Sequence, residues 1–275
     1  LLNVEIKNNE AQSHGGGLAI EGLVGLTAIP DMKKVNITGN KSIGGAGGGL
    51  YVNSAKVNLS RTYIQDNSAD MFGGGISLEY GSRLDIANAF ISGNLLSSGT
   101  QGTNVFVGKS DEIIGSTELF NAINVNMIDT VTTNALSMYS NGLYKQIILN
   151  SIIIGTANAA IPTSNFDLHY SYCGNCDDLL TFKTNVGNLT GDPAFIDSAK
   201  GDFNLSDQSL LLSGAAPTFT SVTNETYTAP TNDLNGDIRP NPYGSILDIG
   251  AYESPYSGKS LAASGIIDGL SANNE

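Results

Sequence analysis

Apolar and polar residues alternate in short runs along the first hundred or so residues of the chain. Runs such as Leu50–Val52, Val57–Leu59, Ile76–Leu78 and Leu84–Ile86 place an apolar side chain at every second position. This period of two is typical of a half-buried β-strand, and no stretch sustains the i, i+3, i+4 spacing of an amphipathic helix. The pattern therefore predicts an all-β protein.

Two sequence markers recur in register with these predicted strands. Three consecutive glycines recur at spacings of 32 and 26 residues, beginning at Gly15, Gly47 and Gly73. An Ile-x-x-Asn marker recurs at spacings of 31, 27 and 27 residues, ending at Asn9, Asn40, Asn67 and Asn94. Two independent markers at nearly the same spacing indicate a repeat protein.

A repeat of about 27 residues built from strands predicts the coils of a parallel β-helix. Each repeat divides into a strand after the glycines, a corner near Asn53 or Gly81, a second strand, and a third strand that ends in Ile-x-x-Asn. Equivalent strands of successive coils would pair in parallel about 4.8 Å apart. Ile37, Ile64 and Ile91 would then stack inside the column.

Asn40, Asn67 and Asn94 would stack at one corner of these coils. Asparagine tolerates the left-handed backbone conformation and can form hydrogen bonds along such a stack, and glycine allows adjacent coils to approach closely. We interpret both markers as structural, because turn chemistry explains them without a ligand.

The paired markers resemble those of the right-handed parallel β-helix repeat proteins of bacterial surfaces, and are similar to those of the chlamydial polymorphic outer-membrane proteins. This resemblance covers roughly the first hundred residues and implies a right-handed parallel β-helix with three-strand coils. It is specific for a fold and not for an activity.

Four ordered elements mark the C-terminal third: Gly191–Asp197, Gly201–Leu205, Asp233–Pro240 and Leu247–Glu253. They resemble the terminal segment of bacterial surface β-helix proteins described as choice-of-anchor domain proteins. One departure is the stretch after Leu205, which lacks the usual proline. The resemblance implies a C-terminal cap, and the open end of a β-helix needs a cover because its strand edges are unpaired.

The C-terminal third also contains two candidate polar sites. Arg239 lies near Asp248 and Glu253, which predicts a buried or half-buried guanidinium–carboxylate pair in the cap. Asp233, Asn235 and Asp237 have the i, i+2, i+4 oxygen spacing of a calcium loop, but Gly244 stands where such a loop needs a bidentate glutamate. We therefore keep calcium as the weaker hypothesis beside the ion-paired cap.

The predicted organisation has three parts. Coils extend over residues 1–190 with an irregular region at 110–141, terminal coils and cap follow over 191–253, and residues 254–275 form a tail or linker. The chain opens in mid-strand at Leu1–Ile6, so we expect a processed or truncated piece of a longer protein.

Charge narrows the range of partners. The formal net charge is −13, from 13 basic and 26 acidic residues, which argues against nucleic acid or an anionic membrane surface as a partner. No run approaches the roughly 20 apolar residues of a membrane span. Glycans, other surface proteins and self-association remain as expected partners.

The two cysteines, Cys173 and Cys176, admit three interpretations. Half a zinc site would need two more ligands at suitable spacing, and a redox motif would need a helix N-terminus. We favour a local disulfide that braces a loop in an exported protein.

Catalysis and sugar binding are also considered. Tyr139, Tyr144, Tyr170 and Tyr172 could form a sugar-stacking surface, although edge and core tyrosines are the favoured interpretation. The carboxylates available for glycoside hydrolysis are scattered over corners and strands, at Asp66, Asp70, Glu79 and Asp85. The bases and cations that a lyase would need are sparse, and we interpret them as solvated: Lys33, Lys34, Arg61 and Arg83.

We therefore expect an extracellular or outer cell-surface β-helix that acts as a structural or adhesive module, with no catalytic residues and no cofactor other than the calcium hypothesis. The first alternative is a carbohydrate-active β-helix enzyme, either a polysaccharide lyase or a glycoside hydrolase. The second alternative is a subunit of an extracellular fibre.

Overall fold

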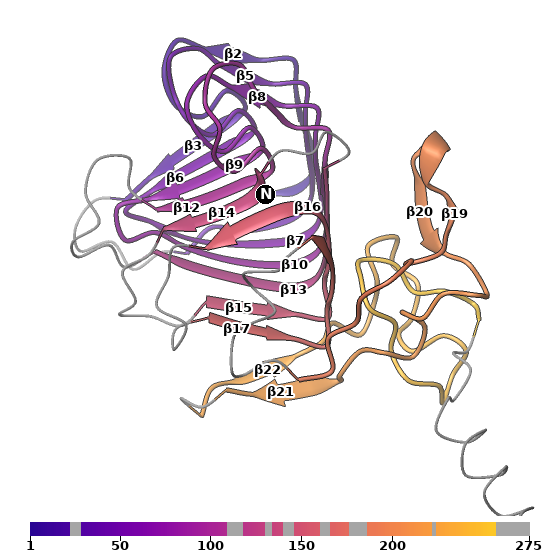
Figure 1. The fold of residues 1–275 in the computed structure, drawn as a ribbon. Coiled ribbons are helices and arrows are strands. Elements are labelled where there is room, and N and C mark those ends of the chain that lie inside the picture. The colour runs from indigo at the N-terminus through magenta and orange to yellow at the C-terminus, as the bar shows by residue number, and fades with distance from the viewer. Residues whose placement is uncertain are drawn as a thin grey trace, which may run out of the picture.

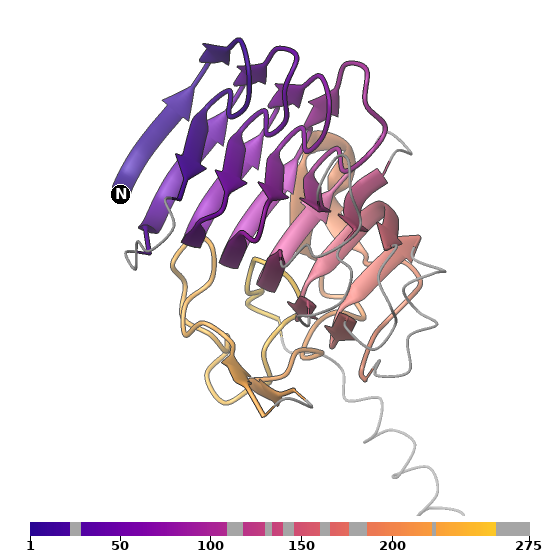
Figure 2. The same ribbon diagram turned by 90° about the vertical axis from the view of Figure 1, so that its left-hand side faces the viewer.

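The structure is a computed structural model, and its described part consists of residues 1–22, 29–108, 118–129, 134–139, 146–159, 166–175, 186–221 and 224–256. Most of the described chain is stacked into coils, and each of the first four contributes one long, one two-residue and one short strand (Figures 1 and 2).

The long strands are β1 (Leu2–Lys7), β4 (Asp31–Thr38), β7 (Lys56–Gln65), β10 (Arg83–Ser92) and β13 (Leu119–Ile128). The two-residue strands are β2 (Glu10–Ala11), β5 (Lys41–Ser42), β8 (Ser68–Ala69) and β11 (Leu95–Leu96). The short strands are β3 (Leu18–Glu21), β6 (Leu50–Asn53), β9 (Ile76–Glu79), β12 (Val105–Gly108) and β14 (Asn134–Tyr139).

Equivalent strands pair in parallel along the whole stack, which confirms the predicted parallel β-helix. One sheet of 14 strands includes the long and the short strands, and a separate sheet of four contains the two-residue strands. Register is kept from coil to coil, so that Ile37 pairs with Ile64, Ile64 with Ile91 and Ile91 with Met127. These side chains are buried in one continuous core cluster.

The coils differ from the predicted division in one respect. The second and third predicted strands are a single long strand that bends at a residue with left-handed backbone, Arg61 in β7 (φ 53°) and Asn88 in β10 (φ 49°). The third strand of each coil is instead the two-residue strand after the asparagine corner, which is too short to produce a period in the sequence.

The strand pattern of the coils changes after β12, beyond the last glycine triplet. The last coils contain β15 (Gln146–Leu149), β16 (Ile152–Ala159), β17 (Phe166–His169) and β18 (Tyr172–Asn175). β16 pairs first with the long strand β13 and then, beyond Gly155 (φ 107°), with the short strand β14. Within the described residues the four-stranded sheet has no member after β11. The glycine triplet is lost one coil earlier, since Gly102, Thr103 and Asn104 precede β12.

The rest of the described chain has little regular structure. It contains two antiparallel pairs, β19 (Phe195–Asp197) with β20 (Asp202–Leu205) and β21 (Thr218–Thr220) with β22 (Thr226–Thr228), and one 3-10 turn, η2 (Ser198–Lys200). We call residues 205–254 the terminal segment. It packs beside the long strands (orange to yellow in Figure 1). The sequence had instead suggested that it covers the end of the column.

Candidate functional site

The outward-facing residues of the long strands form columns that change character along the stack. One column runs from Asn36 through Tyr63, Phe90 and Asn126 to Ile152. The first two are half-buried, whereas the last three are buried beneath the terminal segment. The first coils are therefore open on this flank and the later coils are covered.

The covered part of the flank is a second hydrophobic core. Phe90 of β10, Ile128 of β13 and Ile152 of β16 pack there with Leu211, Leu247 and Ile249 of the terminal segment. Apolar residues point outward on these coils because another layer of the protein covers them. The burial of this apolar surface is what attaches the segment.

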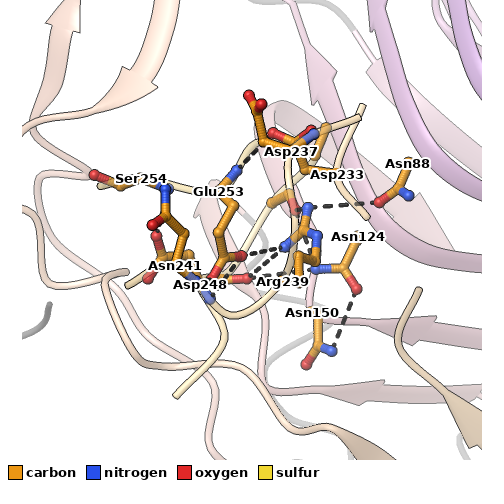
Figure 3. A network of polar contacts seen from close by, with 12 residues as sticks. Asn88, Asn124, Asn150, Asp233, Asp237, Arg239, Asn241, Asp248, Glu253 and Ser254 are labelled. Carbon is orange, nitrogen blue, oxygen red and sulfur yellow. Dashed lines mark hydrogen bonds and ion pairs between the residues drawn. The ribbon is translucent and has the colours of Figure 1, made fainter. Parts of the chain in front are cut away.

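A column of outward asparagines holds the terminal segment in register (Figure 3). Asn88 and Asn124 lie at the bends of β10 and β13, and Asn150 lies between β15 and β16; all three have positive φ, between 49° and 55°. Asn88 Nδ2 donates to the carbonyl of Asn232 at 2.5 Å and Asn124 Nδ2 to that of Gly250 at 3.1 Å.

Asn150 completes this column with two bonds to one residue. Its Nδ2 donates to the carbonyl of Ala216 at 2.7 Å, and its Oδ1 accepts the N–H of Ala216 at 2.8 Å. Each of the three asparagines follows two apolar residues, as in Ile148-Leu149-Asn150. Two apolar residues followed by an asparagine are the only sign of this column in the sequence.

Arg239 lies at the centre of the network in Figure 3. Its Nη1 is 2.8 Å from Oε2 of Glu253, and neither side chain is exposed to solvent. Its Nη2 donates to the carbonyl of Gly250 at 2.9 Å and to Asn88 Oδ1 at 3.5 Å. The expected ion pair is thus buried inside the terminal segment, and the bond from Arg239 to Asn88 makes it part of a joint with β10.

Burial dominates the electrostatics of this joint. It lowers the pKa of Arg239 and raises the pKa of Glu253 to about 7, despite their mutual attraction. It also raises the pKa of Asp248 to about 6, although Asp248 accepts the N–H groups of Ser213 at 2.7 Å and Ser254 at 2.8 Å.

The three residues of the calcium hypothesis do not converge on one point. Both carboxylate oxygens of Asp233 already accept backbone N–H groups, from Gly236, Asp237 and Glu253 at 2.7 to 3.0 Å. Asp233 is buried, whereas Asn235 and Asp237 are exposed. Over the described ranges no three His, Cys, Asp or Glu side chains form a group that could hold a metal ion. Calcium stays a prediction that this geometry does not support.

A polar groove of about 430 Å³ opens where the terminal segment ends on the flank of the first coils. We call it the N-terminal groove; its lining includes Asn36, Lys34, Arg61 and Tyr63 from the coils and Leu234 and Asn235 from the segment.

Arg61 and Tyr63 fix the geometry of this groove. The guanidinium of Arg61 donates to the carbonyls of Leu234 at 3.2 Å and Asn235 at 2.5 Å. Tyr63 Oη donates to Asn235 Oδ1 at 3.4 Å. The interpretation of Arg61 as a solvated residue was therefore wrong, because this side chain anchors the loop that forms one wall.

The other expected residues lie apart from this groove. Tyr172 is buried and donates to the carbonyl of Gly191, which fits the favoured structural interpretation. The side chain of Tyr139, and Tyr144 altogether, lie outside the described residues. Cys173 is buried and is not a free thiol, but Cys176 lies outside the described residues, so their pairing stays a prediction.

The carboxylates considered for hydrolysis do not face one another across a described cleft. Asp66 is exposed at a corner, Asp70 accepts the N–H of Gly44, and Glu79 is buried beside Ser77. Asp85 pairs with Arg83 at 2.7 Å.

Comparison with known protein families, with curated proteins and with solved structures gives no match. The described part of the chain contains no helix long and apolar enough to cross a membrane. The parallel β-helix therefore rests on the strand pairing, and the resemblance to bacterial surface proteins stays a prediction.

Proposed function

We propose that the protein is an adhesive module of an extracellular or cell-surface β-helix, and that it binds a glycan in the N-terminal groove. The observation that carries this proposal is the groove itself, a hollow lined mainly by polar residues and one tyrosine where the terminal segment ends on the flank of the first coils.

The chemistry of the groove suits a sugar. Asn36 and Asn235 offer amide donors and acceptors for hydroxyl groups, and the groove also contains both a cation, Lys34, and a carboxylate, Glu5, which can bond to hydroxyl groups. The ring of Tyr63 offers an apolar face with a polar edge. Rigid strands hold the floor of the groove, so little ordering should accompany binding.

One further property supports an extracellular location, and another argues against one class of partner. Cys173 is not a free thiol, and disulfides persist mainly in oxidising compartments. The net charge of −13 makes nucleic acid a poor partner for so acidic a surface.

A glycan array tests the proposal directly. We expect the purified chain to bind at least one glycan class, and we expect the variant with both Lys34→Asn and Asn36→Ala to lose most of that signal. Lys34 is exposed and asparagine tolerates its left-handed backbone, so the variant should remain folded. Lys41→Asn is the matched control, because Lys41 is an exposed lysine on β5 that does not line the groove.

Each other outcome has a definite meaning. Equal binding by the double variant would place the site elsewhere, and absence of binding by the folded chain would contradict the adhesive proposal and favour a structural or fibre-forming role. Cleavage of a bound polysaccharide, measured as new reducing or unsaturated ends, would favour the enzyme alternative.

A further inference from the structure

A second groove lies on the same flank, beside the hairpin formed by β21 and β22. Its volume is about 400 Å³, and we call it the hairpin groove. Asn58 of β7, Asp85 of β10 and Asn121 of β13 pair in register and line its floor. Thr226, Tyr227 and Thr228 of β22 form its wall.

The polar groups of the hairpin groove are oriented by one carboxylate. Asp85 Oδ2 accepts from Arg83 Nε at 2.7 Å, and Asp85 Oδ1 accepts from Asn121 Nδ2 at 2.7 Å. Because the amide nitrogen of Asn121 is held by Asp85, its Oδ1 is directed away from that carboxylate.

Asn121 Oδ1 supplies an independent sign of a ligand. Asn121 is only 2% exposed, and its Oδ1 has no hydrogen-bond partner among the described residues. A buried acceptor without a donor costs about 1–3 kcal/mol, and the hydroxyl group of a sugar is a donor that could satisfy it. Ala87, Ile123 and Tyr227 add apolar surface beside it, which suits the C–H faces of a sugar ring.

The two grooves share a floor strand and a wall. β7 contributes Asn58 to the hairpin groove and Tyr63 to the N-terminal groove. Because β7 bends at Arg61 between them, these two residues are less than about 17 Å apart, the length of five residues of extended strand at about 3.4 Å per residue. The wall is also one stretch of chain, residues 226–235, which is fastened between the grooves by the bond from Asn88 to Asn232.

We infer that the two grooves are successive subsites for one linear oligosaccharide that runs obliquely across β7. This inference rests on the proposed function, since it assigns the polymeric character of the ligand that the N-terminal groove binds. A monosaccharide or a single terminal sugar would occupy one groove alone, whereas a chain would use both.

Affinity as a function of chain length tests the inference. The probes are the oligosaccharides, from disaccharide to hexasaccharide, of the glycan that gives the strongest array signal, measured by isothermal titration calorimetry. We expect the affinity to rise at least tenfold between the shortest and the longest probe, because the second groove adds contacts once it is reached.

A variant that fills the hairpin groove separates the two subsites. Thr226 is exposed, so Thr226→Trp should block that groove without disturbing the fold. We expect it to remove the gain of the long probes and to leave the affinity of the disaccharide unchanged. Thr220→Trp is the matched control, since Thr220 is the exposed cross-strand neighbour of Thr226 and does not line the groove.

The failure of each proposal is distinguishable. If short probes bind but affinity is independent of length, or if Thr226→Trp binds long probes as the unmodified chain does, the two-subsite inference is wrong and the proposed function stands. If no probe of any length binds the folded chain, both are overturned.

Discussion

At the scale of single residues, glycine is required in each triplet for two separate reasons. The first glycine of each triplet has left-handed backbone, with φ of 69°, 68° and 58° at Gly15, Gly47 and Gly73. The second has no room for a side chain, because a Cβ on Gly48 would lie 2.3 Å from the carbonyl oxygens of Gly74 and Ser68. Backbone of the next coil therefore occupies the space of a methyl group.

This distinction predicts the cost of substituting each kind of glycine. Gly48→Ala should lower the free energy of unfolding by about 1–3 kcal/mol or more, since the clash is with backbone that cannot move aside. Gly44→Ala is the control, because Gly44 has φ of 67° but no atom within 4 Å of its would-be Cβ, and it should cost about 1 kcal/mol. Urea unfolding of both variants measures the difference, and a larger loss for Gly44→Ala would contradict the explanation.

At the scale of elements, a ladder of asparagines joins the corners of the coils. Asn40, Asn67 and Asn94 are almost fully buried. Asn67 Oδ1 accepts both the backbone N–H and the side-chain amide of Asn40, at 3.0 and 2.9 Å. Asn67 in turn donates from its N–H and its side chain to Asn94 Oδ1, and from its side chain to the carbonyl of Ile37. Every polar atom of this amide is used.

Removal of the middle member should therefore be costly. Asn67→Leu removes the acceptor of the backbone N–H and the side-chain amide of Asn40, and it removes the side-chain donor to the carbonyl of Ile37. Asn94 Oδ1 keeps the backbone N–H of residue 67, but each buried group left unpaired costs about 1–3 kcal/mol. We expect a loss of at least about 3 kcal/mol in thermal or chemical unfolding. Asn9→Ala, at the exposed end of the same ladder, should cost less than about 1 kcal/mol; equal losses at Asn9 and Asn67 would refute the role of burial.

The elements show which parts of the fold could be read from the sequence. Strands with four or more residues, such as β6 and β9, were predictable because alternation needs only a few positions to be visible. The bend at Arg61 was not, because arginine in left-handed backbone contradicts local preference, and the partners of its side chain, Leu234 and Asn235, are distant in sequence.

The two candidate grooves could not be predicted from the sequence for a related reason. The N-terminal groove joins Lys34 and Tyr63 to Asn235, and the hairpin groove joins Asp85 to Tyr227. Neighbouring coils are linked by the repeat, so their contacts follow from its spacing. The terminal segment has no repeat, and nothing in its residues states which coils it covers.

At the scale of the whole molecule, the joint around Arg239 makes attachment of the terminal segment depend on pH. Asp248 and Glu253 have folded pKa values of about 6 and about 7, above their usual values of 3.8 and 4.5. The folded state therefore binds protons more tightly than the unfolded state does. The stabilising contribution is complete below about pH 4 and is lost as the pH rises through 6 to 7.

We therefore expect the terminal segment to be held more firmly at pH 5 than at pH 8. Hydrogen exchange of the amides of residues 232–254, corrected for the intrinsic effect of pH, measures this. Glu253→Gln should flatten the dependence, whereas Asp237→Asn, which changes an exposed carboxylate of the same segment, should leave it intact. Firmer attachment at pH 8 would show that attraction to Arg239 outweighs burial.

The bonds from Arg61 to the terminal segment close a loop of 173 residues, whereas the bonds between neighbouring coils of the asparagine ladder span 27. Coils can thus assemble one after another with short loop closures, but the segment must wait until β7, β10, β13 and β16 are all in place. In mechanical terms, a pull on the C-terminal end would load this side attachment before it loads any coil. The segment would detach under tension first, while the coils beneath it stay folded and keep their length.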